Sequence, residues 1–83
     1  MEYYEVYANR IIKLCEERKI TINRLASMSG VRQSTIDNII HGVSKNPTVR
    51  TIHQIATGFS MTMSEFMDFP ELDEYPIGIE DEK

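Results

Sequence analysis

The side chains best suited to binding another molecule are concentrated in the middle of the sequence. Between positions 18 and 50 there are six cationic residues and one acidic residue, Asp37, so this segment has a net charge of +5. Arginine and lysine pair with phosphate and carboxylate groups, and the carboxamides of Gln33 and Asn38 can both donate and accept hydrogen bonds. The composition favours an anionic partner, although a solvated surface without a specific function would look similar.

This positive segment is hidden in the charge of the whole chain. The 83 residues have a net charge of -4 and an isoelectric point of about 5.0. Residues 70–83 alone have a net charge of -5, which leaves +1 for residues 1–69. The acidic isoelectric point is therefore a poor guide to the electric field around the middle of the chain.

Residue types that carry out catalysis or hold metals are not arranged in the usual patterns. The sequence has no glycine-rich phosphate loop, no nucleophile elbow and no pair of carboxylates in a plausible cleft. Cys15, His41 and His53 do not have a metal-binding spacing. We therefore expect no enzyme activity, no metal and no cofactor, and we expect Cys15 to be buried as a small apolar residue.

Membrane and export signals are also missing from the pattern. The longest unbroken apolar stretch is three residues, Val6–Ala8, whereas a spanning helix needs about 20. No basic segment precedes an apolar one as in a secretory signal. We expect a cytoplasmic protein that does not contact a membrane.

The elements that must position the central side chains all have helical spacing. Apolar residues repeat every three or four positions, and Thr21, Thr48 and Thr62 stand where helices need N-caps, the last in a Thr-Met-Ser-Glu capping box. We predict helices over about 5–18, 22–28, 33–41, 49–59 and 63–68. The predicted fold is all-α, a compact five-helix bundle formed by residues 1–69.

Residues 70–83 form an acidic C-terminal tail. Pro76 and Gly78 interrupt the alternation of Tyr75, Ile77 and Ile79, so we expect an extended tail rather than a strand. The tail could be disordered or contact a dimer partner, and its acids could compete with phosphate for the basic residues. The apolar side chains between Met61 and Phe69 could complete the core or form a dimer surface.

A further pattern concerns the two central helices. Leu25-Ala26, Gly30, Ile36 and Ile39 have the spacing of two helices that cross through a tight turn. A larger set of residues extends this pattern on both sides: Thr21–Ala26, Gly30–Ile36, Gly42, Asn46–Thr48, Ile55–Ala56, Met63 and Phe66. On these residues the chain, over positions 5–68, resembles the lambda-repressor-like (XRE/Cro) helix-turn-helix family.

The resemblance implies that the helix over 33–41 enters the major groove of double-stranded DNA and reads bases with its first turns. The base-contacting residues it implies are Gln33, Ser34, Asp37 and Asn38. A carboxamide matches the N6 and N7 edge of adenine, and Asp37 could accept from cytosine N4 or repel phosphate. Gln33 and Asn38 could also be ordinary polar surface residues.

The family positions that meet the DNA backbone are occupied here by Thr21, Arg24, Arg32, Lys45, Asn46 and Thr48. The chain departs from the family pattern in three respects, which involve four positions. Arg32 stands where relatives usually have a Ser or Thr N-cap, and Lys19 stands where they often have Gly, which suggests a different ending of the first helix. Cys15 and Ile40 stand where some relatives have an Arg-Glu pair, so the link is apolar here.

These implications lead to a function. One small domain contacts too few bases to bind both tightly and selectively, so we expect a homodimer on a palindromic operator with half-sites about 34 Å apart. Such a dimer would block polymerase, so a transcriptional repressor of prokaryotic or phage type is expected. The alternative is a protein-interaction module, such as an antitoxin or antirepressor, built on the same fold.

Overall fold

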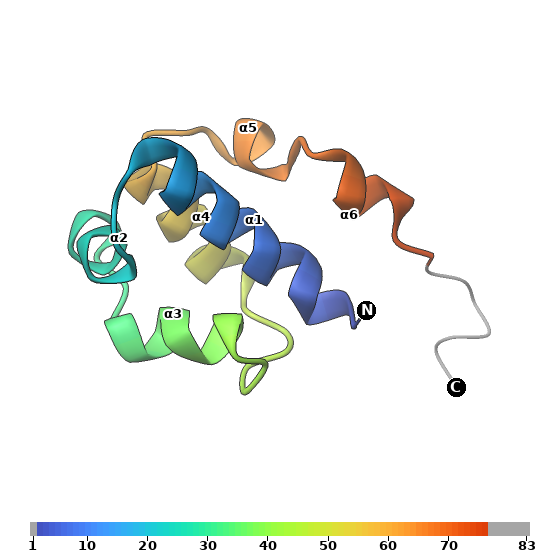
Figure 1. Ribbon diagram of the computed structural model, residues 1–83, viewed down its shortest axis with the longest axis horizontal. Coiled ribbons are helices and arrows are strands. Elements are labelled where there is room, and N and C mark those ends of the chain that lie inside the picture. Colours follow the sequence, from blue (N-terminus) through green and yellow to red (C-terminus); the bar gives the residue numbers. More distant parts are fainter. Residues whose placement is uncertain (1, 77–83) are drawn as a thin grey trace.

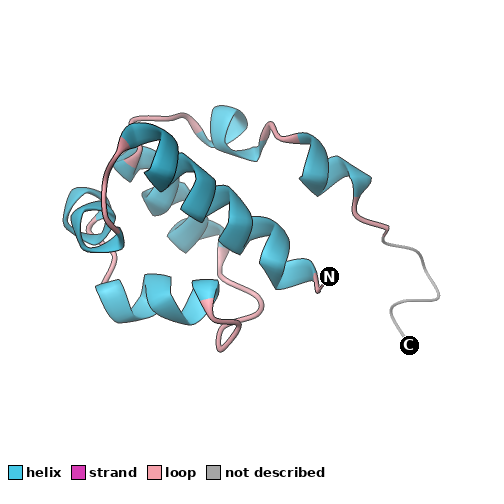
Figure 2. Ribbon diagram, in the orientation of Figure 1, coloured by secondary structure: helices cyan, strands magenta, loops and turns pink. Residues whose placement is uncertain are grey.

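The computed structural model describes residues 2–76, and every regular element in this range is a helix (Figure 1). Figure 2 shows that short loops join the helices. In chain order they are α1 (Tyr3–Arg18), α2 (Ile22–Ser29), α3 (Gln33–Ile40), α4 (Val49–Gly58), α5 (Met63–Met67) and α6 (Pro70–Glu74). The all-α fold is confirmed, with one helix more than predicted.

Local side-chain signals begin several of the helices. The hydroxyls of Thr21, Thr48 and Thr62 each accept a hydrogen bond from a backbone N–H three residues later, at 3.0 to 3.1 Å. Glu65 Oε1 accepts from the Thr62 N–H at 2.8 Å and completes the predicted capping box. Arg32 begins α3 without a side-chain cap, which agrees with its departure from the family pattern.

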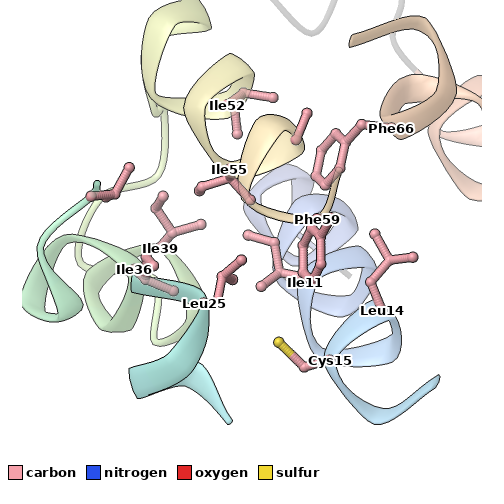
Figure 3. Close-up of a cluster of buried hydrophobic side chains, with 12 residues drawn as sticks. Ile11, Leu14, Cys15, Leu25, Ile36, Ile39, Ile52, Ile55, Phe59 and Phe66 are labelled. Carbon is pink, nitrogen blue, oxygen red and sulfur yellow. The ribbon is translucent and has the colours of Figure 1, made fainter. Parts of the chain in front are cut away.

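Apolar side chains from α1 to α5 meet in one core (Figure 3). Its completely buried members include Ile11, Leu25, Ile36, Ile55, Phe59 and Phe66. Cys15 is buried in this core as predicted, and burial raises the pKa of its thiol. The core positions α3, because α3 packs against both α1 and α2.

The apolar side chains between Met61 and Phe69 complete this core. Phe66 and Phe69 are buried, and Met61, Met63 and Met67 are partly buried against the core cluster. The segment therefore contributes to the core of the single chain, and its second role as a dimer surface stays a prediction.

The beginning of the acidic C-terminal tail is helical. Pro70 is at the start of α6, where its fixed φ and missing N–H are well tolerated. Phe69 before it is buried, and the ring of Tyr75 after it meets the ring of Tyr3 at 5.1 Å between centroids. A helix at Pro70–Glu74 was not predicted. Tyr75, the first residue of the segment expected to be extended, has an extended backbone with φ -64° and ψ 125°, and residues 77–83 of the tail lie outside the described residues.

The end of α1 also differs from the expectation. Lys19 has φ 56° and ψ 43°, which is the left-handed conformation, and the next N–H, that of Ile20, donates to the Cys15 carbonyl at 3.0 Å. A glycine would give the same ending. The departure at Lys19 therefore does not change how α1 ends, because the lysine accepts the steric cost of a left-handed backbone.

Candidate nucleic-acid interface

The helix-turn-helix formed by α2 and α3 packs against the hydrophobic core. Gly30 ends α2 with φ 74°, a left-handed conformation that lets the chain turn at once into α3. Leu25 and Ile36 are fully buried beneath this turn. On the other side of α2, a Cβ at Gly58 would lie 2.7 Å from Cβ of Ser29, so α2 and α4 approach closely. These contacts fix which face of α3 points outward.

The outer face of α3 contains the four predicted base-contacting residues. Ile36 and Ile39 point into the core with at most 1% exposure. The remaining positions of the helix leave Gln33, Ser34 and Asn38 exposed and Asp37 half-buried, with His41 exposed just after the helix. The structure therefore brings these residues together on one face, while their contact with bases stays a prediction.

Asn23 also lies at this site, although it was not among the predicted site residues. Its Nδ2 donates to Gln33 Oε1 at 2.7 Å, so the first turn of α2 is linked to the first turn of α3. The bond uses one of the two lone pairs of the Gln33 oxygen and leaves the Gln33 NH2 group available. The signal in the sequence was a second carboxamide in the first turn of the preceding helix, but its direction depends on how the two helices cross.

The two threonines predicted to contact phosphate differ in whether their hydroxyl proton is already used in a hydrogen bond. Thr48 Oγ1 donates to Thr51 Oγ1 at 3.0 Å and also accepts from the Thr51 N–H. Thr21 Oγ1 accepts from the Arg24 N–H at 3.0 Å, and within residues 2–76 no acceptor takes its proton. Thr21 can therefore donate to an incoming oxygen without giving up a bond, whereas Thr48 must first release Thr51.

The cations of the central segment have different surroundings. Arg24 and Arg32 are exposed and form no ion pair with another described residue. Arg18 instead donates to the Phe59 carbonyl, and its guanidinium carbon lies 5.6 Å from the centroid of the Phe59 ring. Arg18 thus ties the end of α1 to the end of α4, so its charge is used within the fold.

The remaining predicted phosphate contacts lie in the loop after α3. The N–H groups of Val43 and Ser44 both donate to the Asn38 carbonyl, at 2.9 and 3.0 Å, and so fold the loop back on the end of α3. Lys45, Asn46 and Thr48 follow in this loop and are exposed. Candidate phosphate-binding side chains therefore flank α3 at both ends, with Thr21, Arg24 and Arg32 at the N-terminal end.

Within residues 2–76, no three His, Cys, Asp or Glu side chains are grouped so that they could hold a metal ion. No helix in the described part of the chain has the length and apolar character needed to cross a membrane.

A family of known proteins and a known regulator match this chain. Residues 10–71 match the Cro/C1-type HTH DNA-binding domain. The chain is 37% identical over 60 residues to the HTH-type transcriptional regulator SlrR of Bacillus subtilis (strain 168), covering 71% of this chain and 40% of the regulator. The chain thus spans less than half the length of that relative.

Two solved structures have the same fold. A crystal structure of prophage Lp1 protein 11 matches with a TM-score of 0.77 and 32% identity, covering 89% of this chain and 99% of the other. An HTH_3 family transcriptional regulator from Vibrio cholerae matches with a TM-score of 0.73 and 26% identity, covering 83% of this chain and 38% of the other. These matches confirm the resemblance and the fold predicted from the sequence.

Proposed function

Because the chain belongs to the Cro/C1-type helix-turn-helix family of DNA-binding domains, we propose that it is a sequence-specific repressor of transcription. It binds a palindromic operator as a homodimer and inserts α3 of each copy into the major groove. The observation that carries this proposal is the outward face of α3, with polar side chains along it and candidate phosphate-binding groups at both of its ends.

Gln33 is the central base-reading residue in this proposal. It opens α3, is exposed, and is held by Asn23. Its NH2 group donates to N7 of a purine, and the second lone pair of its oxygen accepts from N6 of adenine. Asn23 is a positioning residue, because it acts through Gln33. Ser34 and Asn38 read neighbouring bases, and Asp37 selects cytosine or excludes phosphate.

The phosphate contacts determine register and most of the affinity. Thr21, Arg24 and Arg32 bind the backbone on one side of α3, and Lys45, Asn46 and Thr48 bind it on the other. Each cation that neutralises a phosphate steepens the dependence of log affinity on log salt by about 0.9. Arg18 is not part of this set, because its guanidinium binds the Phe59 carbonyl.

The test is a selection of the purified protein against a random duplex library at about 150 mM salt, where nonspecific attraction is screened. A palindrome with half-sites about one helical turn apart is the expected enrichment. Gln33→Ala should then cost about 1 to 3 kcal/mol and relax preference at one base pair, whereas Lys45→Ala should weaken all duplexes alike.

A protein-interaction module is the second candidate, and the net charge of -4 favours it. Acidic side chains of α6, Glu71, Asp73 and Glu74, are exposed and suit a basic partner better than a duplex. Two outcomes would favour this candidate: no duplex is enriched in the library selection, and Gln33→Ala and Lys45→Ala do not differ in their effects on DNA binding.

A further inference from the structure

The first turn of α1 lies against the loop that follows α3. A Cβ at Gly42 would lie 2.6 Å from Cζ and 2.8 Å from the hydroxyl oxygen of Tyr4. Gly42 itself has φ 77°. The tyrosine ring is therefore in close contact with the loop backbone, and this contact brings the N-terminus of α1 next to the side chains that follow in the loop.

Aromatic contacts fix this turn in place. The hydroxyls of Tyr3 and Tyr7 are 3.2 Å apart and hydrogen bonded, and the Tyr3 ring also meets the ring of Tyr75 beyond α6. Tyr3 and Tyr7 line a cavity of about 130 Å³ with Asn46 and Pro47 of the loop. The start of α1 is thus braced by α6 on one side and packed near the loop on the other.

Glu2, the residue just before α1, connects this turn to a basic side chain. Its Oε1 lies 3.2 Å from Lys45 Nζ, and this is the one ion pair among residues 2–76. Both side chains are more than half exposed, at 62% and 57%. In the protein alone, the ammonium proposed to bind phosphate is therefore paired with a carboxylate of the same chain.

We propose that Glu2 competes with DNA phosphate for Lys45 and so weakens DNA binding by this domain. The inference rests on the proposed DNA-binding function. A carboxylate and a phosphate accept the same N–H donors, and the two anions repel each other at close range. A duplex that engages Lys45 must therefore displace Glu2 or come close to a negative charge.

Exposure limits the size of this competition and makes it dependent on salt. Exposed ion pairs contribute little, because water and dissolved ions screen them. The competition is strongest at low salt and fades as the salt concentration rises. The acids of the tail were also considered as competitors, and those at positions 80–82 lie outside the described residues. Within residues 2–76, the acid that pairs with a candidate phosphate contact is Glu2.

The test compares Glu2→Gln with Glu5→Gln in the full chain. Both changes remove one negative charge near the start of α1, but Glu5 forms no ion pair with Lys45. The probe is a labelled duplex carrying the selected operator, titrated by fluorescence anisotropy at low and at physiological salt. Circular dichroism of each variant checks whether it is folded like the wild type.

Glu2→Gln should tighten binding at low salt by roughly two- to fivefold more than Glu5→Gln does. In the Lys45→Ala background the two variants should behave alike, because the competitor has lost its target. Equal effects of Glu2→Gln and Glu5→Gln in the chain with Lys45, with wild-type binding intact, would overturn the competition alone. No specific binding by wild type or by either variant would overturn the proposed function, and the competition with it.

Discussion

Removing Asn23 tests whether the bond to Gln33 serves base reading. Both side chains are exposed, so neither truncation leaves a buried polar group, and the fold should remain. Gln33→Ala should cost about 1 to 3 kcal/mol of binding. A net hydrogen bond contributes about 0.5 to 1.5 kcal/mol, so Asn23→Ala should cost roughly 1 kcal/mol, which is about fivefold in affinity.

The double variant separates positioning from direct contact. If Asn23 acts by orienting Gln33, Asn23→Ala should cost nothing further once Gln33 is alanine, which gives a coupling energy of about 1 kcal/mol. Anisotropy titrations on the selected operator and on operators with single base changes measure both affinity and preference. Ser27→Ala, an exposed change on the same helix, should leave both unchanged. Additive losses would show that Asn23 binds DNA itself, and this would refute the reasoning.

Three other changes test local features of the fold. Lys19→Gly should raise stability by about 1 kcal/mol, or about 4 to 8 °C in Tm, because glycine adopts the left-handed backbone of this position without a steric cost; Lys19→Ala is the control and should not show this gain. Gly42→Ala should lower stability by about 1 to 3 kcal/mol, since the new Cβ would meet the Tyr4 ring, and an unchanged urea midpoint would contradict this contact. Hydrogen bonds from Thr62 lower the pKa of Glu65, so the stability that the Glu65 carboxylate adds is present above its unfolded pKa and is lost as the pH falls through its folded pKa. Glu65→Gln still accepts the bond and should therefore lose less stability in acid than the wild type. The same pH dependence of the urea midpoint in both proteins would argue against a contribution from the capping box.

Much of the fold was predictable because it depends on local and periodic signals. Thr21, Thr48 and Thr62 cap the helices that their positions predict. The buried isoleucines at helical spacing include Ile36, Ile39, Ile52 and Ile55. Each of these features needs only the residue and its near neighbours along the chain. The outward face of α3 follows from the same pattern, because burying Ile36 and Ile39 leaves few other directions for Gln33.

Other features depend on distances between segments that the sequence does not contain. The bonds from Asn23 to Gln33 and from Lys45 to Glu2 join residues 10 and 43 positions apart. They exist only because helices cross and pack in a particular way. The left-handed backbone of Lys19 could not be predicted for a different reason. Local sterics favour glycine in this conformation, but the packing of α1 and α2 on either side outweighs that cost.

The charge distribution explains how an acidic chain can bind DNA. Figure 1 shows α6 toward one end of the longest axis and α2 toward the other, in a molecule that measures 39 by 24 by 21 Å. At physiological salt a charge is screened beyond about 8 Å. The acids of α6 then have little effect on a duplex held at α3, and the nearby cations dominate.

At low salt the same acids are no longer screened. Lowering the salt then strengthens the phosphate contacts and the long-range repulsion together, so the measured salt slope should be shallower than the number of phosphate contacts alone implies. Glu2 acts differently, because it lies within contact distance of Lys45. Deleting residues 70–83 would not isolate the long-range effect, because it also removes Tyr75 from the ring of Tyr3. Neutralising the exposed acids of α6 one by one keeps Tyr75 in the chain and so tests the effect of charge more directly than the deletion does.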